Sequence, residues 1–352
     1  MKFDLAILQA ALGVVAPAIA TKSAVDQLTH IWFYGDHIMG FNDVIGISKP
    51  FETDFTGGLP GKVLLDLLGV ADAKEVEITP KGDHVLVVVG SAEVELPCHS
   101  LDQSVFNFKD LAAVKSSFEV SAELRKALNL VMLTLSSKER PMVDQNGITL
   151  ICDGDTLDLY TTDGVAMSCA SVPPPAEFDL ERLVLTPLFV EQLLRFCADG
   201  GKMSVTGDGA LAMNEGGVCL FGRVIDPEDS ATDYPQYLSR YLPKGMRDKV
   251  VEIPPRLRLA LERALVISNK AVPVTLTLDG EKLRIRVEVK GRGKLDDSMA
   301  LAAPHNKAEI VIYPELIKRA LPQVKTIGIA RQCLVMTGDQ GYVYLAAEVA
   351  NG

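Results

Sequence analysis

The sequence is poor in the residues from which metal and cofactor sites are usually built. It has five histidines and one tryptophan, and its six cysteines include no C-x-x-C pair. None of the patterns H-E-x-x-H, G-x-x-x-x-G-K-S/T, G-x-S-x-G or G-x-G-x-x-G occurs. Each of these patterns places specific ligands or backbone amides around a metal, a phosphate or a nucleophile. Their absence argues against an enzyme, and we expect no metal, no cofactor and no catalytic residue.

Two motifs that suggest chemistry fit ordinary turns. Asp153 and Asp155 flank Gly154 between strand-like segments, and Asp-Gly steps are typical of hairpins. The run Gly291-Arg292-Gly293-Lys294 weakly resembles a phosphate loop but falls where another hairpin turn is expected. An enzyme using Asp153 and Asp155 as an acid/base or metal-binding pair is the alternative, and Asp153→Ala would abolish its activity. We expect three histidines to lie on the surface or in turns without partners: His84, His99 and His305.

Basic residues are scarce for a nucleic-acid-binding protein. The chain has 35 lysines and arginines against 46 aspartates and glutamates, a net charge of −11. A protein that wraps nucleic acid with its whole surface is usually basic, so only a local basic surface is compatible with such binding. With 352 residues, 48% of them hydrophobic, the chain is long enough for two or three globular domains. A core of this size needs no disulfides, which favours reduced thiols.

One apolar segment, at the N-terminus, resembles a signal peptide. It begins with Met1-Lys2 and ends in Ala18-Ile19-Ala20, an A-x-A pattern. Asp4 lies where the apolar region would begin, and the segment is also part of an internal repeat. We therefore expect it to stay in the folded protein. No other apolar run reaches membrane-spanning length, so we expect a cytoplasmic protein with no membrane association.

A repeat of helix-opening prolines organises the chain. Pro60, Pro187 and Pro314 each precede a leucine-rich stretch with helical periodicity, and successive prolines are 127 residues apart. Proline suits the first turn of a helix because its missing N–H would be unpaired there. A second phrase also recurs three times: an apolar–acidic–apolar strand followed by leucines at i, i+4 and i+8. It begins at Phe3, Phe118 and Val251.

Alternating strand patterns fill the space between these helices. Three follow the first helix of each unit, at 30–48, 147–172 and 273–301, and three follow the second helix, at 76–96, 203–224 and 326–349. Within the segment 273–301, Asp279-Gly280 is expected to be a hairpin turn. The fold class is therefore α+β, with three repeated domains of two helices packed on antiparallel sheets. We place the domains at residues 1–115, 116–247 and 248–352.

Charge is distributed unevenly among the three expected domains. Their net charges are −7, −8 and +4, so the first and third would attract each other in a head-to-tail contact between two chains. Arg256, Arg263 and Lys270 are seven residues apart and would share one stripe of a helix. We expect a weak phosphate-binding surface from the basic residues on and beside the expected helices: Lys22, Lys62, Arg125, Lys126, Arg195, Lys202, Arg256, Arg263, Lys270, Lys318 and Arg319.

These features resemble one known family across essentially the whole chain. Three repeats of two helices and paired hairpins are similar to the bacterial DNA polymerase III β subunit, the DNA sliding clamp. Its T-D-G turn is matched by Thr162-Asp163-Gly164, and its N-G step by Asn146-Gly147. Further local matches occur in the family's order: Asp233-Tyr234, Leu242-Pro243-Lys244, Arg263-Ala264, Ile267-Ser268-Asn269 and Tyr342-Val343-Tyr344-Leu345.

The resemblance implies a non-catalytic processivity factor. Clamps of this family form a head-to-tail homodimeric ring around double-stranded DNA, bind it without sequence preference and tether a DNA polymerase. An ATPase clamp loader opens the ring, and partners dock through short clamp-binding peptide motifs. The implied localisation is the cytoplasm, with the replicating DNA. The peptide pocket carries over onto Gln145, Thr162, Gly164, Val165, Met167, Tyr234, Tyr237, Val343, Tyr344 and Leu345.

The chain departs from the family pattern at several of these places. Val165-Ala166-Met167 follows the T-D-G turn where the family commonly has H-R-L, and Pro235-Gln236 replaces two arginines. The first expected helix, within residues 6–16, has no basic residue. Such departures suit a divergent or phage-encoded member. The alternative function is a clamp-fold interaction or decoy protein that does not encircle DNA, which the sparse basic residues of the first domain favour.

Overall fold

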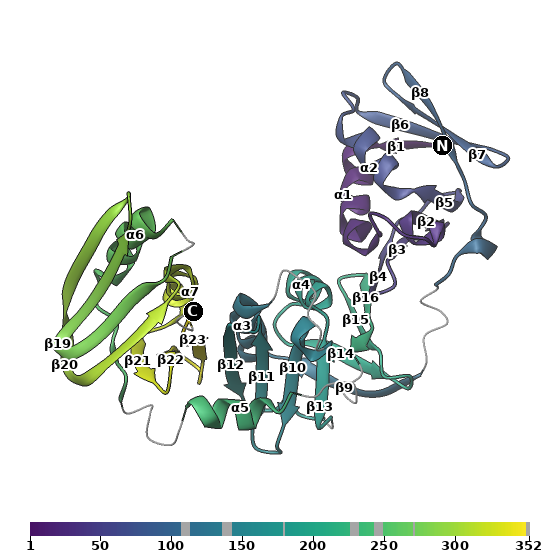
Figure 1. Cartoon of the computed structure of the whole chain (residues 1–352). Coiled ribbons are helices and arrows are strands. Elements are labelled where there is room, and N and C mark those ends of the chain that lie inside the picture. Colours follow the sequence, from purple (N-terminus) through teal and green to yellow (C-terminus); the bar gives the residue numbers. More distant parts are fainter. Residues whose placement is uncertain are drawn as a thin grey trace. The chain divides into compact units, whose positions relative to one another are not determined.

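The structure is a computed structural model, which describes residues 1–106, 113–135, 143–178, 180–225, 232–242, 249–269 and 272–349 (Figure 1). Contacts divide the chain into two compact units. Unit 1 consists of Met1–Ser121, Pro175–Asp179 and Leu188–Val224, and unit 2 of Ala122–Pro174, Leu180–Pro187 and Ile225–Gly352. The expected boundary between residues 115 and 116 lies near Ser121, where the first segment of unit 1 ends. Lys270 and the 247/248 boundary lie outside the described residues.

Unit 1 contains two antiparallel sheets. The smaller has the order β1-β6-β7-β8, and the larger β5-β2-β3-β4-β16-β15-β14-β9. The strands of the smaller sheet are β1 (Lys2–Asp4), β6 (Glu75–Lys81), β7 (His84–Val89) and β8 (Ala92–Pro97). Those of the larger are β2 (His30–Tyr34), β3 (His37–Phe41), β4 (Ile45–Pro50), β5 (Thr56–Pro60), β9 (Val114–Val120), β14 (Gly201–Thr206), β15 (Leu211–Glu215) and β16 (Val218–Gly222).

The N-terminal segment forms a helix of unit 1 with one buried face. Helix α1 (Leu5–Val15) starts at Asp4, whose side chain accepts a hydrogen bond from the Ile7 amide at 3.0 Å. Its leucines Leu8 and Leu12 are fully buried, and the helix packs on α2 (Gly61–Gly69) and on β3 and β4. Gly40 of β3 lets the end of α1 approach closely, because a Cβ there would lie 2.9 Å from the Val15 carbonyl oxygen.

The larger sheet of unit 1 is continuous across the expected boundary between the first two domains. Strand β4 pairs antiparallel with β16, more than 160 residues later, with Ile47 opposite Leu220 and Gly46 opposite Phe221. Phe221 also packs beside Phe41 and Phe106, whose rings stack with centroids 4.3 Å apart. This pairing is why the contacts assign residues 188–224 to unit 1.

Unit 2 is built on a nine-stranded sheet and a long hairpin. The sheet order is β17-β13-β10-β11-β12-β23-β22-β21-β18, and β19 pairs with β20 in a separate sheet. The strands of the large sheet are β10 (Ile148–Cys152), β11 (Leu157–Thr162), β12 (Ala166–Val172), β13 (Arg182–Leu185), β17 (Val224–Ile225), β18 (Val251–Glu252), β21 (Thr326–Ala330), β22 (Cys333–Thr337) and β23 (Val343–Ala347). The hairpin strands are β19 (Val274–Val289) and β20 (Gly293–Ile312).

Helices begin at or beside all three repeated prolines, as the sequence predicts. Pro60 immediately precedes α2, whereas Pro187 and Pro314 are the first residues of α4 (Pro187–Phe196) and α7 (Pro314–Ala320). The second repeated phrase is also present: short strands β1, β9 and β18 are followed by α1, α3 (Ala122–Val131) and α6 (Leu257–Ser268). The predicted leucine stripes are buried at Leu124 and Leu128 of α3 and at Leu257 and Leu261 of α6.

The expected hairpin turn at Asp279-Gly280 is wrong. Strand β19 continues through this step, and the pairing register with β20 shifts on both sides of Gly280. Gly280 has a φ of 56°, so it produces a bulge within the strand rather than a reversal. The chain reverses between Val289 and Gly293, where the Gly291-Arg292 sequence supplies the turn.

Three further features of the fold are the C-terminal end of α6, the state of the cysteines and the lack of a membrane-spanning helix among the described residues. Helix α6 ends at Ser268, and Asn269 closes it in the left-handed conformation with a φ of 53°. None of the six cysteines, all of which lie in the described part of the chain, forms a disulfide. Within the described residues, no helix combines the length and apolar character needed to cross a membrane.

Candidate functional site

A cavity of about 420 Å³ opens on unit 2 over one face of the large sheet, at its middle strands β12, β23 and β22. Its walls come from the β11–β12 turn, helix α5 (Tyr234–Tyr241), strands β22 and β23, and Gln145. The expected pocket residues that line it are Gln145, Thr162, Gly164, Val165, Met167, Tyr234, Tyr237 and Leu345. The sequence did not indicate the other lining residues, which are Ala166, Thr232, Asp233, Gln236, Tyr241, Cys333 and Ala347.

The floor of the cavity follows from strand pairing. Strand β12 pairs with β23 so that Met167 is opposite Leu345, and β23 pairs with β22 so that Cys333 is opposite Ala347. Because side chains alternate between the two faces of a strand, these residues lie on one face of the sheet. Met167, Leu345 and Cys333 belong to one buried cluster with Tyr160, Tyr234 and Val343. The cavity therefore has an apolar floor.

Helix α5 forms the wall above this floor. Its N-cap is Asp233, whose Oδ1 accepts a hydrogen bond from the Gln236 amide at 2.9 Å. The ring of Tyr234 is buried and stacks on Tyr160, with centroids 5.3 Å apart and planes 12° from parallel. Tyr237 and Tyr241 follow at helical spacing and pack together. That spacing is the signal from which Tyr241 was predictable.

The T-D-G turn forms the rim. Asp163 Oδ1 accepts hydrogen bonds from the Val165 and Ala166 amides at 3.0 and 2.7 Å, and Gly164 has a φ of 79°. These bonds explain why aspartate and glycine occupy this turn. The second carboxylate oxygen of Asp163 accepts a hydrogen bond from Arg319 Nη1 at 2.8 Å. The Asp163–Arg319 contact anchors the turn to α7. The turn thus presents the exposed side chain of Val165 at the mouth of the cavity.

Two expected pocket residues do not line the cavity, and they differ in where they lie. Val343 is buried in the cluster beneath the floor. Tyr344 points to the other face of β23, because neighbouring residues of a strand alternate. Its hydroxyl donates to the Leu316 carbonyl oxygen at 2.9 Å and accepts from Arg319 Nη2 at 3.1 Å. Tyr344 therefore supports the site from behind.

Burial keeps the ionisable groups at the cavity floor uncharged. Burial raises the pKa of the Cys333 thiol to about 12, so the thiol is protonated at neutral pH. Burial also raises the pKa values of Tyr160 and Tyr237. Asp233 is the one carboxylate among the lining residues, and it caps α5. The cavity thus offers an apolar floor, hydroxyl groups and backbone amides.

The expected DNA-contacting residues fall into two groups. Lys22, Lys202 and Arg256 are exposed and form no ion pair within the described part of the chain. Others already have acidic or carbonyl partners: Lys62 with Asp66 at 2.7 Å, Arg263 with Asp297 at 3.0 Å, and Arg195 with the Gly13 carbonyl oxygen at 3.4 Å. Arg125, Lys126 and Lys318 lie on α3 and α7, where Lys126 lies near enough to Asp339 to lower its pKa.

Arg319 differs most from its expected role. Its guanidinium is held between Asp163 and Tyr344, and its side chain is only 29% exposed. It also lies over the Tyr344 ring, 5.7 Å from the centroid. The sequence suggested an exposed position because Lys318 and Arg319 are opposite the apolar helix face of Leu316, Ile317, Ala320 and Leu321. Tertiary packing instead turns Arg319 toward the T-D-G turn.

The turn and histidine expectations have mixed outcomes. Asp153 accepts hydrogen bonds from the Asp155 and Thr156 amides, which explains it as a turn residue and lowers its pKa. The expectation that His84, His99 and His305 lack partners is wrong. His84 contacts Asp83 at 2.6 Å, His305 contacts the Lys249 carbonyl oxygen at 2.8 Å, and His99 contacts Asp26 at 3.1 Å. The last contact joins segments 73 residues apart, which no local pattern reveals.

Comparisons with known proteins agree with this architecture. No family model matches the sequence. A protein named Beta sliding clamp from Synechocystis sp. is 23% identical over 327 residues, covering 83% of this chain and 82% of that protein. The crystal structure of a sliding clamp (DNA polymerase III subunit β) from Bartonella birtlesii, bound to griselimycin, has a TM-score of 0.85 at 17% identity and covers 100% of this chain and 99% of that one.

A second solved structure gives the same result. The DNA polymerase III β subunit from Thermotoga maritima has a TM-score of 0.82 at 18% identity, and it covers 100% of this chain and 99% of that one. The low identities agree with the departures at Val165-Ala166-Met167, after the T-D-G turn, and at Pro235-Gln236. Over its whole length, the chain therefore has the fold of the DNA polymerase III β subunit, the sliding clamp, and is a divergent relative of these proteins in sequence.

Proposed function

We propose that the protein is a DNA sliding clamp, a non-catalytic processivity factor that encircles duplex DNA. The main support for this proposal is that the fold is similar to that of the solved clamps over the full length of the chain, with three pairs of helices and antiparallel strands. Its three domains are residues 1–115, 116–247 and 248–352, and two chains assemble head to tail into a ring. A ring holds a bound polymerase at high effective concentration near the primer end without gripping the DNA sequence.

The proposed DNA contacts are loose and electrostatic. Lys22, Lys202 and Arg256 present unpaired charges in a protein of net charge −11. Contacts between such side chains and phosphates carry no sequence information and weaken with salt. The ring slides because it is topologically closed rather than tightly bound. The acidic remainder of the surface repels DNA elsewhere.

The cavity of unit 2 is the proposed docking site for partner peptides. Its volume of about 420 Å³ suits one or two apolar side chains, and exposed Val165 and Tyr237 extend the apolar surface around its mouth. The partners are a DNA polymerase, an ATPase clamp loader and other DNA-processing proteins with short peptide motifs. These activities place the protein in the cytoplasm with replicating DNA.

The ring is tested by solution mass and small-angle X-ray scattering on one untagged sample. The expected result is twice the 38.0 kDa mass of the chain and a scattering profile with a central hole. A monomer over a wide concentration range would contradict the closed ring. It would favour the second candidate, a clamp-fold interaction or decoy protein, for which the charge-free helix α1 is the supporting observation.

The DNA-facing surface is tested by charge reversal. Arg256, Arg263 and Lys318 changed together to glutamate should abolish stimulation of primer extension on a circular template in the presence of a polymerase and its loader. A matched control changes three exposed lysines of the β19–β20 hairpin to glutamate: Lys282, Lys290 and Lys294. The control should retain stimulation. Equal stimulation by both triple variants would contradict the proposed lining.

A further inference from the structure

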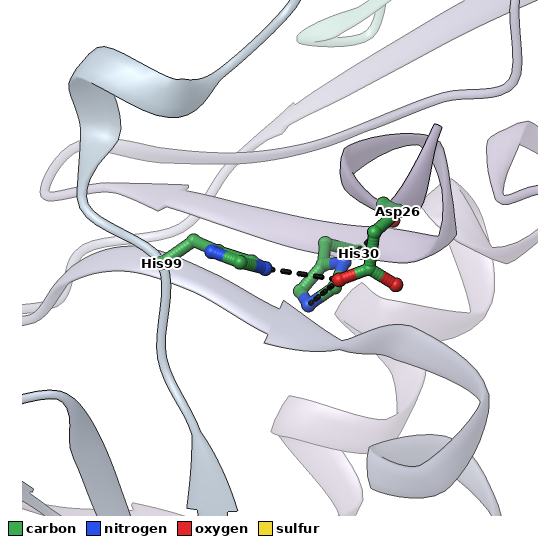
Figure 2. A group of neighbouring side chains, drawn as sticks. All are labelled: Asp26, His30 and His99. Atoms are coloured by element: carbon green, nitrogen blue, oxygen red, sulfur yellow. Dashed lines mark hydrogen bonds and ion pairs between the residues drawn. The ribbon is translucent and has the colours of Figure 1, made fainter. Parts of the chain in front are cut away.

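Three potential metal ligands converge in unit 1, far from the cavity in sequence. Asp26 lies in a short 3₁₀ turn (Asp26–Thr29), His30 is the first residue of β2, and His99 follows β8. Figure 2 shows both imidazole rings directed at the Asp26 carboxylate. One carboxylate oxygen, Oδ2, lies 3.1 Å from His99 Nε2 and 3.9 Å from His30 Nε2. All three ligand atoms lie within 4.8 Å of one another.

The hydrogen bonds of His30 fix its tautomer. Its Nδ1 lies 2.9 Å from the Asp26 carbonyl oxygen and 3.2 Å from Thr29 Oγ1. The Thr29 hydroxyl donates its own proton to the Asp26 carbonyl oxygen at 2.7 Å, so both oxygens can only accept at Nδ1. The His30 proton is therefore on Nδ1. The lone pair of Nε2 points toward Asp26.

His99 has the same arrangement. Its Nδ1 lies 2.8 Å from Gln103 Oε1, a carbonyl oxygen that accepts a proton from the ring. In the neutral ring with its proton on Nδ1, Nε2 also presents a lone pair to Asp26, whereas a doubly protonated ring donates from Nε2 to the Asp26 carboxylate at 3.1 Å. Three electron-pair donors thus converge, because an ionised carboxylate only accepts. A cation satisfies all three, and histidine ligands of metals characteristically donate their other ring N–H to a carbonyl or carboxylate oxygen.

The surrounding structure holds the two histidines in place. His30 is 2% exposed, and the neighbouring Trp32 indole donates to the Gln27 carbonyl oxygen at 3.3 Å. The backbone of His99 is fixed by a two-way bridge to Gly58, with N···O distances of 2.8 and 2.9 Å. In contrast, the Asp26 side chain is 70% exposed and free to adjust. Tetrahedral zinc, with ligands at about 2.0–2.2 Å, needs ligand atoms about 3.3 Å apart. The Asp26–His99 separation of 3.1 Å is close to this value, and the 3.9 Å separation between Asp26 and His30 requires the exposed Asp26 side chain to move toward His30.

We propose that Asp26, His30 and His99 bind one divalent transition-metal ion, with zinc as the preferred ion and water in the fourth position. Two imidazoles and one carboxylate suit zinc better than calcium or magnesium, which prefer oxygen ligands. The metal would link the Asp26–Thr29 turn to the loop after β8. The site is independent of the proposed clamp function.

The test uses the full-length protein and Co²⁺ as a spectroscopic probe for zinc. The wild type should bind one Co²⁺ per chain with visible ligand-field bands and no thiolate-to-cobalt charge-transfer band, and zinc should displace the cobalt. His99→Ala and Asp26→Asn should each weaken binding by at least about tenfold. Both side chains are partly or largely exposed, so these variants are expected to fold. Circular dichroism verifies that they do.

His84→Ala is the matched control, because His84 is also beside an aspartate but lacks a second histidine. It should bind Co²⁺ as the wild type does. Failure of the wild type to bind Co²⁺ or zinc at micromolar concentration would overturn the proposal. Unchanged affinity in His99→Ala, or a thiolate charge-transfer band from the free cysteines, would also overturn it.

Discussion

Arg319 is held by partners from two segments outside its own helix. Its guanidinium contacts the Asp163 carboxylate in the T-D-G turn and the Tyr344 hydroxyl on β23, while its own backbone belongs to α7. Asp163 is 15% exposed, so removal of the arginine leaves a poorly solvated carboxylate without its cation. The residue thus connects the rim of the cavity to the helix behind the sheet.

Arg319→Ala should lower the free energy of unfolding by about 2 kcal/mol, between the values typical of exposed and buried ion pairs. Urea denaturation followed by circular dichroism measures the change. Lys318→Ala is the control, because Lys318 forms no ion pair within the described residues, and it should change stability by less than about 0.5 kcal/mol. Equal effects of the two substitutions would show that the Arg319–Asp163 pair is energetically unimportant.

Cys333 provides a test of burial at the cavity floor. Burial disfavours the thiolate and raises the pKa of this thiol to about 12, so the reactive fraction at pH 8 is very small. Alkylation by iodoacetamide should be about a thousandfold slower than for an ordinary cysteine of pKa about 8.5. The rate should rise about tenfold per pH unit up to the raised pKa while the protein stays folded.

Peptide mass spectrometry of the labelled protein measures this rate. Half-buried Cys152, the last residue of β10, is the internal comparison, and labelling in urea verifies that every thiol can react. Labelling of Cys333 at pH 8 as fast as that of Cys152 would contradict the buried position.

At the scale of elements, helix α5 forms a cavity wall although little of its surface is buried against the rest of the unit. It has eight residues, and only Tyr234 is fully buried. Isolated helices of this length are unstable in water, so the N-cap and the stacking of Tyr234 on Tyr160 determine whether the wall persists. A helix of this kind is well suited to adjusting around different peptides.

Loss of the cap should therefore destabilise this helix locally. Asp233→Ala removes the hydrogen bond from the Gln236 amide, worth about 1 kcal/mol, and should increase amide exchange in residues 236–242 about fivefold. Hydrogen exchange with mass spectrometry measures the exchange rate of these amides. Asp233→Ser keeps a capping oxygen and should exchange nearly as slowly as the wild type. An unchanged rate in Asp233→Ala would mean that Tyr234 alone holds the helix.

At the scale of the whole molecule, charge asymmetry is the property relevant to assembly. The proposed first domain has a net charge of −7 and the third +4. Opposite charges on the two surfaces of a head-to-tail contact accelerate association more than they strengthen it. The asymmetry also favours the head-to-tail orientation, because two first domains, or two third domains, carry charge of the same sign and repel each other.

Dimer formation by the proposed clamp should accordingly slow with salt. Raising ionic strength from 0.05 to 0.5 M shortens the Debye length to about a third, and we expect the association rate to fall at least about fivefold. Stopped-flow fluorescence with labelled chains measures the rate. A salt-independent rate would contradict electrostatic steering and indicate an apolar interface.

The local features of this fold were predictable because short segments encode them. Proline at a helix start, leucines at i and i+4, and aspartate beside glycine in a turn act within a few residues, and they identified α2, α4, α7 and the β10–β11 turn. Asp279-Gly280 was misread because a glycine with positive φ serves equally in a turn or a bulge, and only its partner strand distinguishes them.

The sequence by itself determined the α+β class, the threefold spacing of the helices and most of the residues around the cavity. Only the tertiary structure decided which strands join distant repeats, which face of β23 Tyr344 occupies, and that Arg319 is engaged by Asp163. It alone brought Asp26, His30 and His99 together. The physical reason is range: helix and turn preferences act between near neighbours in sequence, whereas strand pairing and side-chain convergence depend on residues tens to hundreds of positions apart.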